Sequence, residues 1–297
     1  MIPLVVMLGM AAALSVQPAS PVAPDAQLVK LADGFTFTEG PASDRRGNVY
    51  FTDQPNDRIL VWTVDGKLET FFQPSGRANG LCFGPDGRLW ICADEKNELW
   101  AMDVRTKKHT VAVKADEAGG RLNGPNDVWV APNGAVYFTD PYYRRPYWPA
   151  GTEKREPQSV FCLSPDGKTL TRVASDLKQP NGIIGTPDGK TLYIADIGDG
   201  KTYAYDITRD GSLTNKRLFC NMGSDGMTID SEGNVYLTGP GVVVFDKTGR
   251  EIARIPVPEE RWTANVCFGG KDRRTLFITA GRGLYSIRMR TRGVGSQ

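Results

Sequence analysis

Six side chains that carry an oxygen atom recur at one phase of a repeated pattern in this sequence of 297 residues. Each lies 11 or 12 positions before an aromatic residue in a short apolar run. The six are Glu39, Asn79, Asn126, Asn181, Asp225 and Asn265. Asn and Asp are common in turns, where they hydrogen-bond their own backbone, but this preference does not explain why all six share one phase. Carboxylate and amide oxygens are the ligands that hard divalent cations prefer.

The elements that would position these side chains repeat six times. The aromatic residues are Tyr50, Trp90, Tyr137, Tyr193, Tyr236 and Phe277, at steps of 40, 47, 56, 43 and 41 residues. Turn residues precede each apolar run, and a second β-like run follows it. This period, with about four antiparallel strands per repeat, is typical of a propeller blade. The sequence therefore predicts an all-β, six-bladed β-propeller with a central channel, in which the strand around Leu28 to Phe37 completes the last blade. A β-sandwich is the alternative, but it would not explain six copies in register.

In a propeller, equivalent positions of the blades face the same point on the axis. The six oxygen-bearing side chains should therefore meet at one mouth of the channel. Buried there without a cation, they would be poorly satisfied. The carboxylates of Glu39 and Asp225 would balance one divalent cation, and the neutral amides would complete its shell. Ca²⁺ suits such oxygen donors best; Mg²⁺ and Mn²⁺ are alternatives, and Zn²⁺ is a weaker one because it prefers nitrogen and sulfur.

Composition excludes several other functions. The chain is 40% hydrophobic and 24% charged, and 36 basic against 34 acidic residues give a net charge of +2. Nothing in this balance attracts nucleic acid or an anionic membrane. The single histidine, His109, lies in a Lys-Lys-His-Thr stretch, and no G-x-S-x-G motif is present, so serine-hydrolase chemistry is excluded. The five cysteines are predicted to be buried free thiols, with a Cys82–Cys92 disulfide as the alternative.

The N-terminal residues 1–16 contain no charged side chain and are almost wholly apolar. This run is short for a membrane span but fits the apolar region of a secretory signal. We expect a signal peptide over residues 1–23, cleaved between Ala19 and Ala23, and a single propeller domain over residues 24–297. The mature protein is then exported, periplasmic or extracellular, free of membrane and monomeric. A buried N-terminal helix is the alternative.

Several motifs, taken in order, carry a resemblance to a known family. They are Glu39-Gly40-Pro41, Arg121-Leu122-Asn123-Gly124-Pro125-Asn126-Asp127, Phe138-Thr139-Asp140-Pro141, Pro180-Asn181-Gly182 and Ser224-Asp225-Gly226-Met227. With them the chain resembles the senescence marker protein, gluconolactonase and regucalcin-like family. These are six-bladed propellers that include sugar lactonases and, more distantly, diisopropyl fluorophosphatase.

The resemblance implies a role for each matching residue. Glu39, Asn181 and Asp225 match the metal ligands of the family, and Asp225 also matches its proposed proton acceptor. By internal register the metal-binding asparagine of the third blade is Asn126. Arg121 and Asn123 match a substrate-binding pair, although either Asn123 or Asn126 could be the substrate asparagine. The remaining ring members, Asn79 and Asn265, are expected to face the substrate.

The implied activity is metal-dependent hydrolysis of a sugar-acid lactone, a small-molecule carboxylic ester. The cation, calcium first, would polarise the carbonyl group, and Asp225 would accept a proton from water. The segment from Pro141 to Pro157, rich in Tyr, Trp and Arg, is predicted to be a lid between blades three and four; the alternative is an insertion packed on the propeller. Two other functions stay open. One is phosphotriester or fluorophosphate hydrolysis at the same metal, and the other is a secreted, non-catalytic propeller that calcium stabilises.

Overall fold

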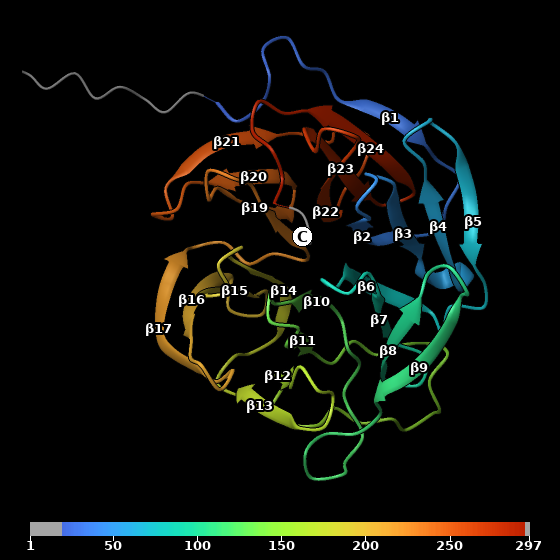
Figure 1. The fold of residues 1–297 in the computed structure, drawn as a ribbon, viewed down its shortest axis with the longest axis vertical. Coiled ribbons are helices and arrows are strands. Elements are labelled where there is room, and N and C mark those ends of the chain that lie inside the picture. The colour runs from blue at the N-terminus through green and yellow to red at the C-terminus, as the bar shows by residue number, and fades with distance from the viewer. Residues whose placement is uncertain (1–19, 295–297) are drawn as a thin grey trace, which may run out of the picture.

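Six four-stranded antiparallel sheets surround a central axis in the computed structural model, which describes residues 20–294. Figure 1 shows them as six blades, with strands β2, β6, β10, β14 and β22 nearest the axis. Strand β18 is the inner strand of the remaining blade and contacts β14 and β22 on either side. The predicted six-bladed β-propeller is confirmed. In residues 20–294 the helical content is one 3-10 turn, η1 (Gln54–Asn56), and no helix there is long and apolar enough to cross a bilayer.

The blades follow one another along the chain, each running from its inner to its outer strand. Blade one has β2 (Thr38–Ser43), β3 (Val49–Asp53), β4 (Arg58–Trp62) and β5 (Leu68–Phe72). Blade two has β6 (Ala78–Phe83), β7 (Leu89–Ala93), β8 (Glu98–Asp103) and β9 (Lys108–Val113). Blade three has β10 (Val128–Val130), β11 (Val136–Asp140), β12 (Ser159–Leu163) and β13 (Leu170–Ala174). Blade four has β14 (Pro180–Gly185), β15 (Thr191–Asp196), β16 (Lys201–Ile207) and β17 (Leu213–Cys220).

The last two blades complete the circle. Blade five has β18 (Met227–Ile229), β19 (Val235–Gly239), β20 (Gly241–Phe245) and β21 (Glu251–Ile255). Blade six has β22 (Thr263–Gly269), β23 (Thr275–Ala280), β24 (Gly283–Arg288) and β1 (Val29–Ala32). Its outer strand β1 pairs with β24, so the N-terminal strand completes the last blade, as predicted. Packing also extends back to Pro21, whose carbonyl accepts the Arg290 N–H. The predicted signal peptide lies mostly in residues 1–19, outside the described part of the chain, and stays a prediction.

The repeated apolar runs form the second strand of each blade, and their side chains fill the space between neighbouring sheets. The aromatic rings Phe51, Phe138 and Tyr236 are fully buried there. All five cysteines are free thiols; four are buried and Cys82 is half-buried, so the Cys82–Cys92 disulfide does not form. His109 is exposed on the outer strand β9, stacked on Trp100, and therefore lies away from the axis.

Threonines in the second strands form hydrogen bonds that link one blade to the next. Their hydroxyls donate to main-chain carbonyls of the following inner strand: Thr52 to Asn79 (3.1 Å), Thr139 to Asn181 (2.7 Å) and Thr238 to Ala264 (2.8 Å). These bonds explain why threonine recurs after the aromatic run. Because two of the acceptors belong to the six oxygen-bearing residues, the same bonds fix the backbone of the candidate site.

A cavity of about 400 Å³ runs along the axis between the inner strands. Its wall has apolar and polar parts of similar extent, with Leu81, Trp129 and Phe268 among the apolar lining residues. Asp127 and Asn265 supply polar groups to it. Val294 also contributes to the wall, and Gly293 pairs with Asp230, so the C-terminal segment lies against the channel (Figure 1).

Candidate functional site

The oxygen-bearing residues, called here the polar ring, lie where the inner strands lose regular pairing. Four ring residues lie at register shifts, which fall between Glu39 and Ala42, Ala78 and Leu81, Pro180 and Ile183, and Thr263 and Asn265. In the other two blades the paired strand begins two residues after Asn126 and Asp225. Such irregularities bend a strand and re-aim its side chains. The local break in pairing is therefore common to all six ring positions.

A glycine follows the ring residue in four blades, because the next blade approaches too closely for a side chain. A Cβ on Gly40 would lie 2.1 Å from the main-chain oxygen of Asn79. A Cβ on Gly226 would lie 1.9 Å from Cγ of Asn265. Gly80 and Gly182 meet Asn126 and Asp225 in the same way. The Asn-Gly, Asp-Gly and Glu-Gly pairs of the sequence thus reflect contact between neighbouring blades.

Contacts between ring members join adjacent blades around one mouth. The Asn181 amide donates to Oδ1 of Asp225 at 2.8 Å, and the Asn265 amide donates to Oε2 of Glu39 at 3.3 Å. On the other side, the N–H of Gly80 donates to the Asn126 carbonyl at 2.8 Å. Asp225 is half-buried and the other five ring residues are buried. The structure therefore brings together the six residues that the repeat singled out.

The acidic groups of the ring are protonated more readily than usual. Burial, followed by the charge of Asp225, raises the pKa of Glu39 well above its ordinary value. Burial raises the pKa of Asp225 to about 6, against the opposing effect of hydrogen bonds from Trp262 and Asn181. Two carboxylates held this close repel each other unless a proton or a cation lies between them.

Two amide oxygens of the ring lack any partner. Oδ1 of Asn79 and Oδ1 of Asn181 are buried and accept no hydrogen bond from the described residues. Buried polar atoms are normally satisfied, so an unpartnered pair requires an explanation. A cation bound by oxygen ligands would satisfy Asn181 and neutralise Glu39 and Asp225, and Oδ1 of Asn79 would stay open to the substrate, as its predicted role requires. The set of donor atoms fits a hard divalent cation. It relies on amide oxygens, because between residues 20 and 294 no three or more His, Cys, Asp or Glu side chains lie close enough together to hold a metal ion.

Three residues at the ring were not predicted as members of the site. Asp127, next to Asn126, is buried, accepts the Val128 and Ile183 N–H groups, and has its pKa raised to about 7 by burial. Trp262 donates its indole N–H to Oδ2 of Asp225 at 2.6 Å, and the Tyr143 hydroxyl accepts from Asn181 at 2.8 Å. Asp127 occupies the position that is glycine in four other blades, which is a signal the sequence does contain. No repeat marks Trp262.

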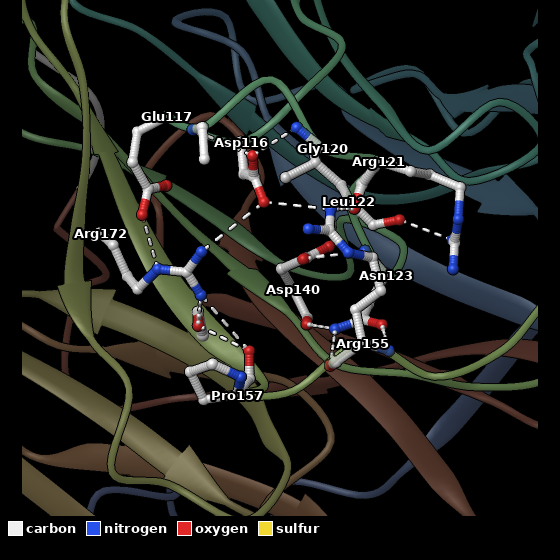
Figure 2. Close-up of polar contacts among 12 residues, drawn as sticks. Asp116, Glu117, Gly120, Arg121, Leu122, Asn123, Asp140, Arg155, Pro157 and Arg172 are labelled. Atoms are coloured by element: carbon white, nitrogen blue, oxygen red, sulfur yellow. Dashed lines mark hydrogen bonds and ion pairs between the residues drawn. The ribbon is translucent and has the colours of Figure 1, made fainter.

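Arg121 and Asn123, the predicted substrate-binding pair, form hydrogen bonds with other residues of the protein. Arg121 donates to the carbonyls of Leu122 and Glu153, and Asn123 is 2% exposed (Figure 2). The Asn123 side chain accepts the Arg155 N–H at 2.8 Å and donates to the Arg155 carbonyl at 2.9 Å. Both residues thus hold residues 153–155 against the loop that leads into blade three. Their contact with substrate stays a prediction, and the geometry gives Asn123 a structural role.

The segment Pro141–Pro157 lies elsewhere in the topology than predicted. It joins β11 to β12 within blade three, so the expected place between blades three and four is wrong. The reason is that the run Ser159–Leu163 pairs with β11 as the third strand of the same sheet. From that position the segment reaches the ring, where Tyr143 contacts Asn181. It also packs on blade two, where the Trp148 indole N–H donates to the Asp94 carbonyl at 2.8 Å.

Comparison with known proteins identifies the family. The SMP-30/Gluconolactonase/LRE-like region matches residues 37–282. The chain belongs to this family. A gluconolactonase of Zymomonas mobilis is 31% identical to this chain over 296 residues, covering 89% of this chain and 81% of that protein. A solved gluconolactonase from Xanthomonas campestris is 33% identical with a TM-score of 0.83, covering 91% of each chain.

Two further proteins are similar, one in fold and one in sequence. The calcium-binding protein regucalcin from Agrobacterium tumefaciens aligns with a TM-score of 0.74 at 20% identity, over 90% of this chain and 95% of that one. A lactonase, drp35, of Staphylococcus haemolyticus is 28% identical over 246 residues, or 77% of this chain and 72% of that protein. The resemblance inferred from the ordered motifs is therefore confirmed at the level of the family.

The raised pKa values of the ring predict a pH-dependent stabilisation by calcium. Without a cation, raised carboxyl pKa values favour folding at low pH, and this contribution is lost as pH rises through about 6. A cation at the ring would bind the deprotonated carboxylates of Glu39 and Asp225, so it should offset that loss. Free Ca²⁺ at 100 times its Kd stabilises by about 2.7 kcal/mol, or roughly 5–10 °C in Tm for a domain of this size.

The measurement is the difference in Tm between saturating Ca²⁺ and chelator at pH 5 and pH 8. We expect this difference to be several degrees larger at pH 8. Glu39→Gln should reduce it at pH 8, whereas the exposed Asp65→Asn should leave it unchanged. A calcium effect that is equal at both pH values would contradict cation binding by the Glu39 and Asp225 carboxylates.

Proposed function

We propose that this protein hydrolyses a lactone of a sugar acid at the polar ring, with one divalent cation held by Glu39, Asn126, Asn181 and Asp225. Two kinds of observation support the proposal. Family membership and the 31% identity to a gluconolactonase favour a sugar lactone as substrate. The observation that carries the cation is the buried, unpartnered Oδ1 of Asn181 beside two carboxylates of raised pKa. Ca²⁺ is the ion that this donor set suits best.

A divalent cation, when bound, supplies a Lewis acid that stabilises negative charge on the carbonyl oxygen of the lactone. The chain supplies the proton transfer. Asp225, with a pKa of about 6, is mostly a carboxylate at neutral pH and would take a proton from the attacking water. The ring oxygen of the lactone leaves as an alcohol and receives a proton, so water is consumed and a hydroxy acid forms.

Neighbouring side chains hold Asp225 for this role. Its Oδ1 accepts from Asn181 and its Oδ2 accepts from Trp262. Both donors favour the charged form and fix the plane of the carboxylate. The Tyr143 hydroxyl, on the segment that joins β11 to β12, accepts from the same Asn181. Together these contacts give a carboxylate of defined orientation at the polar ring.

The test is a hydrolysis screen across sugar lactones, simple lactones and phosphotriesters, with and without chelator. We expect turnover of a sugar lactone that chelator abolishes and added Ca²⁺ restores. Lactone turnover that chelator does not affect would contradict the proposed dependence on a divalent cation. Cleavage of phosphotriesters alone would assign the site to that chemistry. Uptake of Ca²⁺ without hydrolysis of any compound would leave a calcium-stabilised binding propeller as the function.

Export remains our prediction for this protein and is tested separately. The expected result is that the mature protein, recovered from the periplasm or the medium, begins between residues 20 and 24. N-terminal sequencing of that protein would identify the cleavage position, and retention of residues 1–16 would contradict the signal peptide.

A further inference from the structure

An aspartate stands at the end of the second strand or directly after it in four blades, and three of these aspartates have the same structural role. Asp53 accepts the N–H groups of Thr36 and Phe37, just before the inner strand of its own blade. Asp140 accepts those of Asn123 and Gly124, and Asp196 accepts those of Lys178 and Gln179. Each carboxylate thus accepts hydrogen bonds from two main-chain N–H groups where the chain enters the blade. This capping role recurs with the repeat.

Asp94, at the same position of blade two, is used differently. The N–H groups of Ser75 and Arg77 are accepted by Asp57 of blade one, at 2.9 and 2.7 Å. Asp94 is 2% exposed, and its Oδ2 accepts from Arg145 Nε at 2.6 Å and from the Tyr147 hydroxyl at 2.6 Å. Asp94 therefore does not cap its own blade as its counterparts do. Its buried carboxylate instead binds the segment 141–157 through Arg145 and Tyr147.

The hydrogen bond to Asp94 holds Arg145 beside the polar ring. Its guanidinium lies 5.4 Å from the centre of the Tyr143 ring, and Tyr143 in turn bonds Asn181. The charge of Arg145 also lowers the pKa of Asp225, which places it within electrostatic reach of that carboxylate. Among residues 20–294, the structure gives no hydrogen-bond partner to the two terminal nitrogens of Arg145, whose side chain is 21% exposed. Those nitrogens remain available for a ligand.

We propose that Asp94 is a positioning residue that directs the Arg145 guanidinium at the oxygens of the substrate and, more strongly, at the carboxylate of the product. The inference rests on the proposed lactone hydrolysis and deepens it. A guanidinium held at Nε leaves free the two parallel N–H groups at its far end, one on each terminal nitrogen, and these suit a planar carboxylate. Without Asp94 the Arg145 side chain would sample other rotamers and lose that alignment.

The first test compares Asp94→Asn and Arg145→Ala with the unaltered protein. The amide keeps the size of Asp94 but removes its charge, so we expect the inhibition constant of the sugar-acid product to rise about tenfold in both variants. The KM of the lactone should rise less, and kcat should change least. The double variant should be no worse than Arg145→Ala alone, because Asp94 acts through Arg145. Additive effects, or an unchanged inhibition constant in Asp94→Asn, would overturn the proposal.

A matched control separates positioning from general loss of stability. Asp230 is 1% exposed and also accepts a tyrosine hydroxyl, that of Tyr236, but it follows the far end of an inner strand. Asp230→Asn should lower Tm and leave both KM and the inhibition constant unchanged. If the unaltered protein hydrolyses no lactone, the proposed function fails. Binding of the sugar acid by calorimetry then decides the inference alone: equal Kd values for the unaltered protein and Asp94→Asn would refute it.

Discussion

Asp225→Asn is expected to lower kcat for the lactone by about 10³-fold at saturating Ca²⁺. The amide cannot accept a proton from water, and general bases contribute roughly 10² to 10⁴ in rate. Loss of one ligand charge should also weaken calcium binding, so kcat must be measured at calcium concentrations that saturate the variant. Calcium binding followed by calorimetry gives that concentration directly.

Trp262→Phe is the control for this experiment. It removes the N–H that Oδ2 of Asp225 accepts, but keeps an aromatic ring and the carboxylate. Because that hydrogen bond lowers the pKa of Asp225, its loss should move the acid limb of the kcat/KM profile to higher pH while activity persists. An Asp225→Asn variant within tenfold of normal kcat, with calcium bound, would show that another group accepts the proton.

Asp53→Ala is expected to be the most destabilising single substitution among the repeated aspartates. Its buried carboxylate accepts five hydrogen bonds: two from the main chain, at Thr36 and Phe37, one from Asn56 and two from Arg58. Removing one partner of a buried ion pair typically costs 3–5 kcal/mol. For a domain of this size we expect Tm to fall by roughly 6–20 °C.

The exposed Asp65 of the same blade is the matched control. It pairs with Lys271 at 3.6 Å, and both side chains are more than 70% exposed. Such surface pairs contribute little, so Asp65→Ala should leave Tm within about 2 °C of normal. A comparable loss in both variants would mean that the capping role of Asp53 has been overestimated.

The fold was predictable from the sequence because every blade repeats the same local chemistry. Turn residues, an aromatic run and a threonine or alanine recur six times, and each has a local or next-blade cause, such as the bond from Thr139 to Asn181. The polar ring followed from the same register. Its members needed no knowledge of long-range contacts, since equivalent positions of a closed ring must share one mouth.

What the sequence did not predict depends on exceptions to the repeat. Asp94 and Asp140 look alike in the sequence, yet one binds the segment 141–157 and the other caps its own blade. Asn123 matches a substrate residue by motif, but its amide is occupied by Arg155. Trp262 reaches Asp225 from a connection with no repeated motif. The contacts of Asp94, Asn123 and Trp262 are decided by partners 51, 32 and 37 residues away, which local patterns do not encode.

Strand β1 has a consequence for the order of assembly. During synthesis it emerges first of all the strands, but its partner β24 (Gly283–Arg288) is made more than 200 residues later. Until then β1 and the outer edge of the incomplete sixth blade have no mates, and unpaired edges invite wrong associations. Contacts so far apart in the chain also form slowly. The circle therefore closes only after translation is almost finished, and a nascent chain must be kept from premature pairing until its final strand arrives.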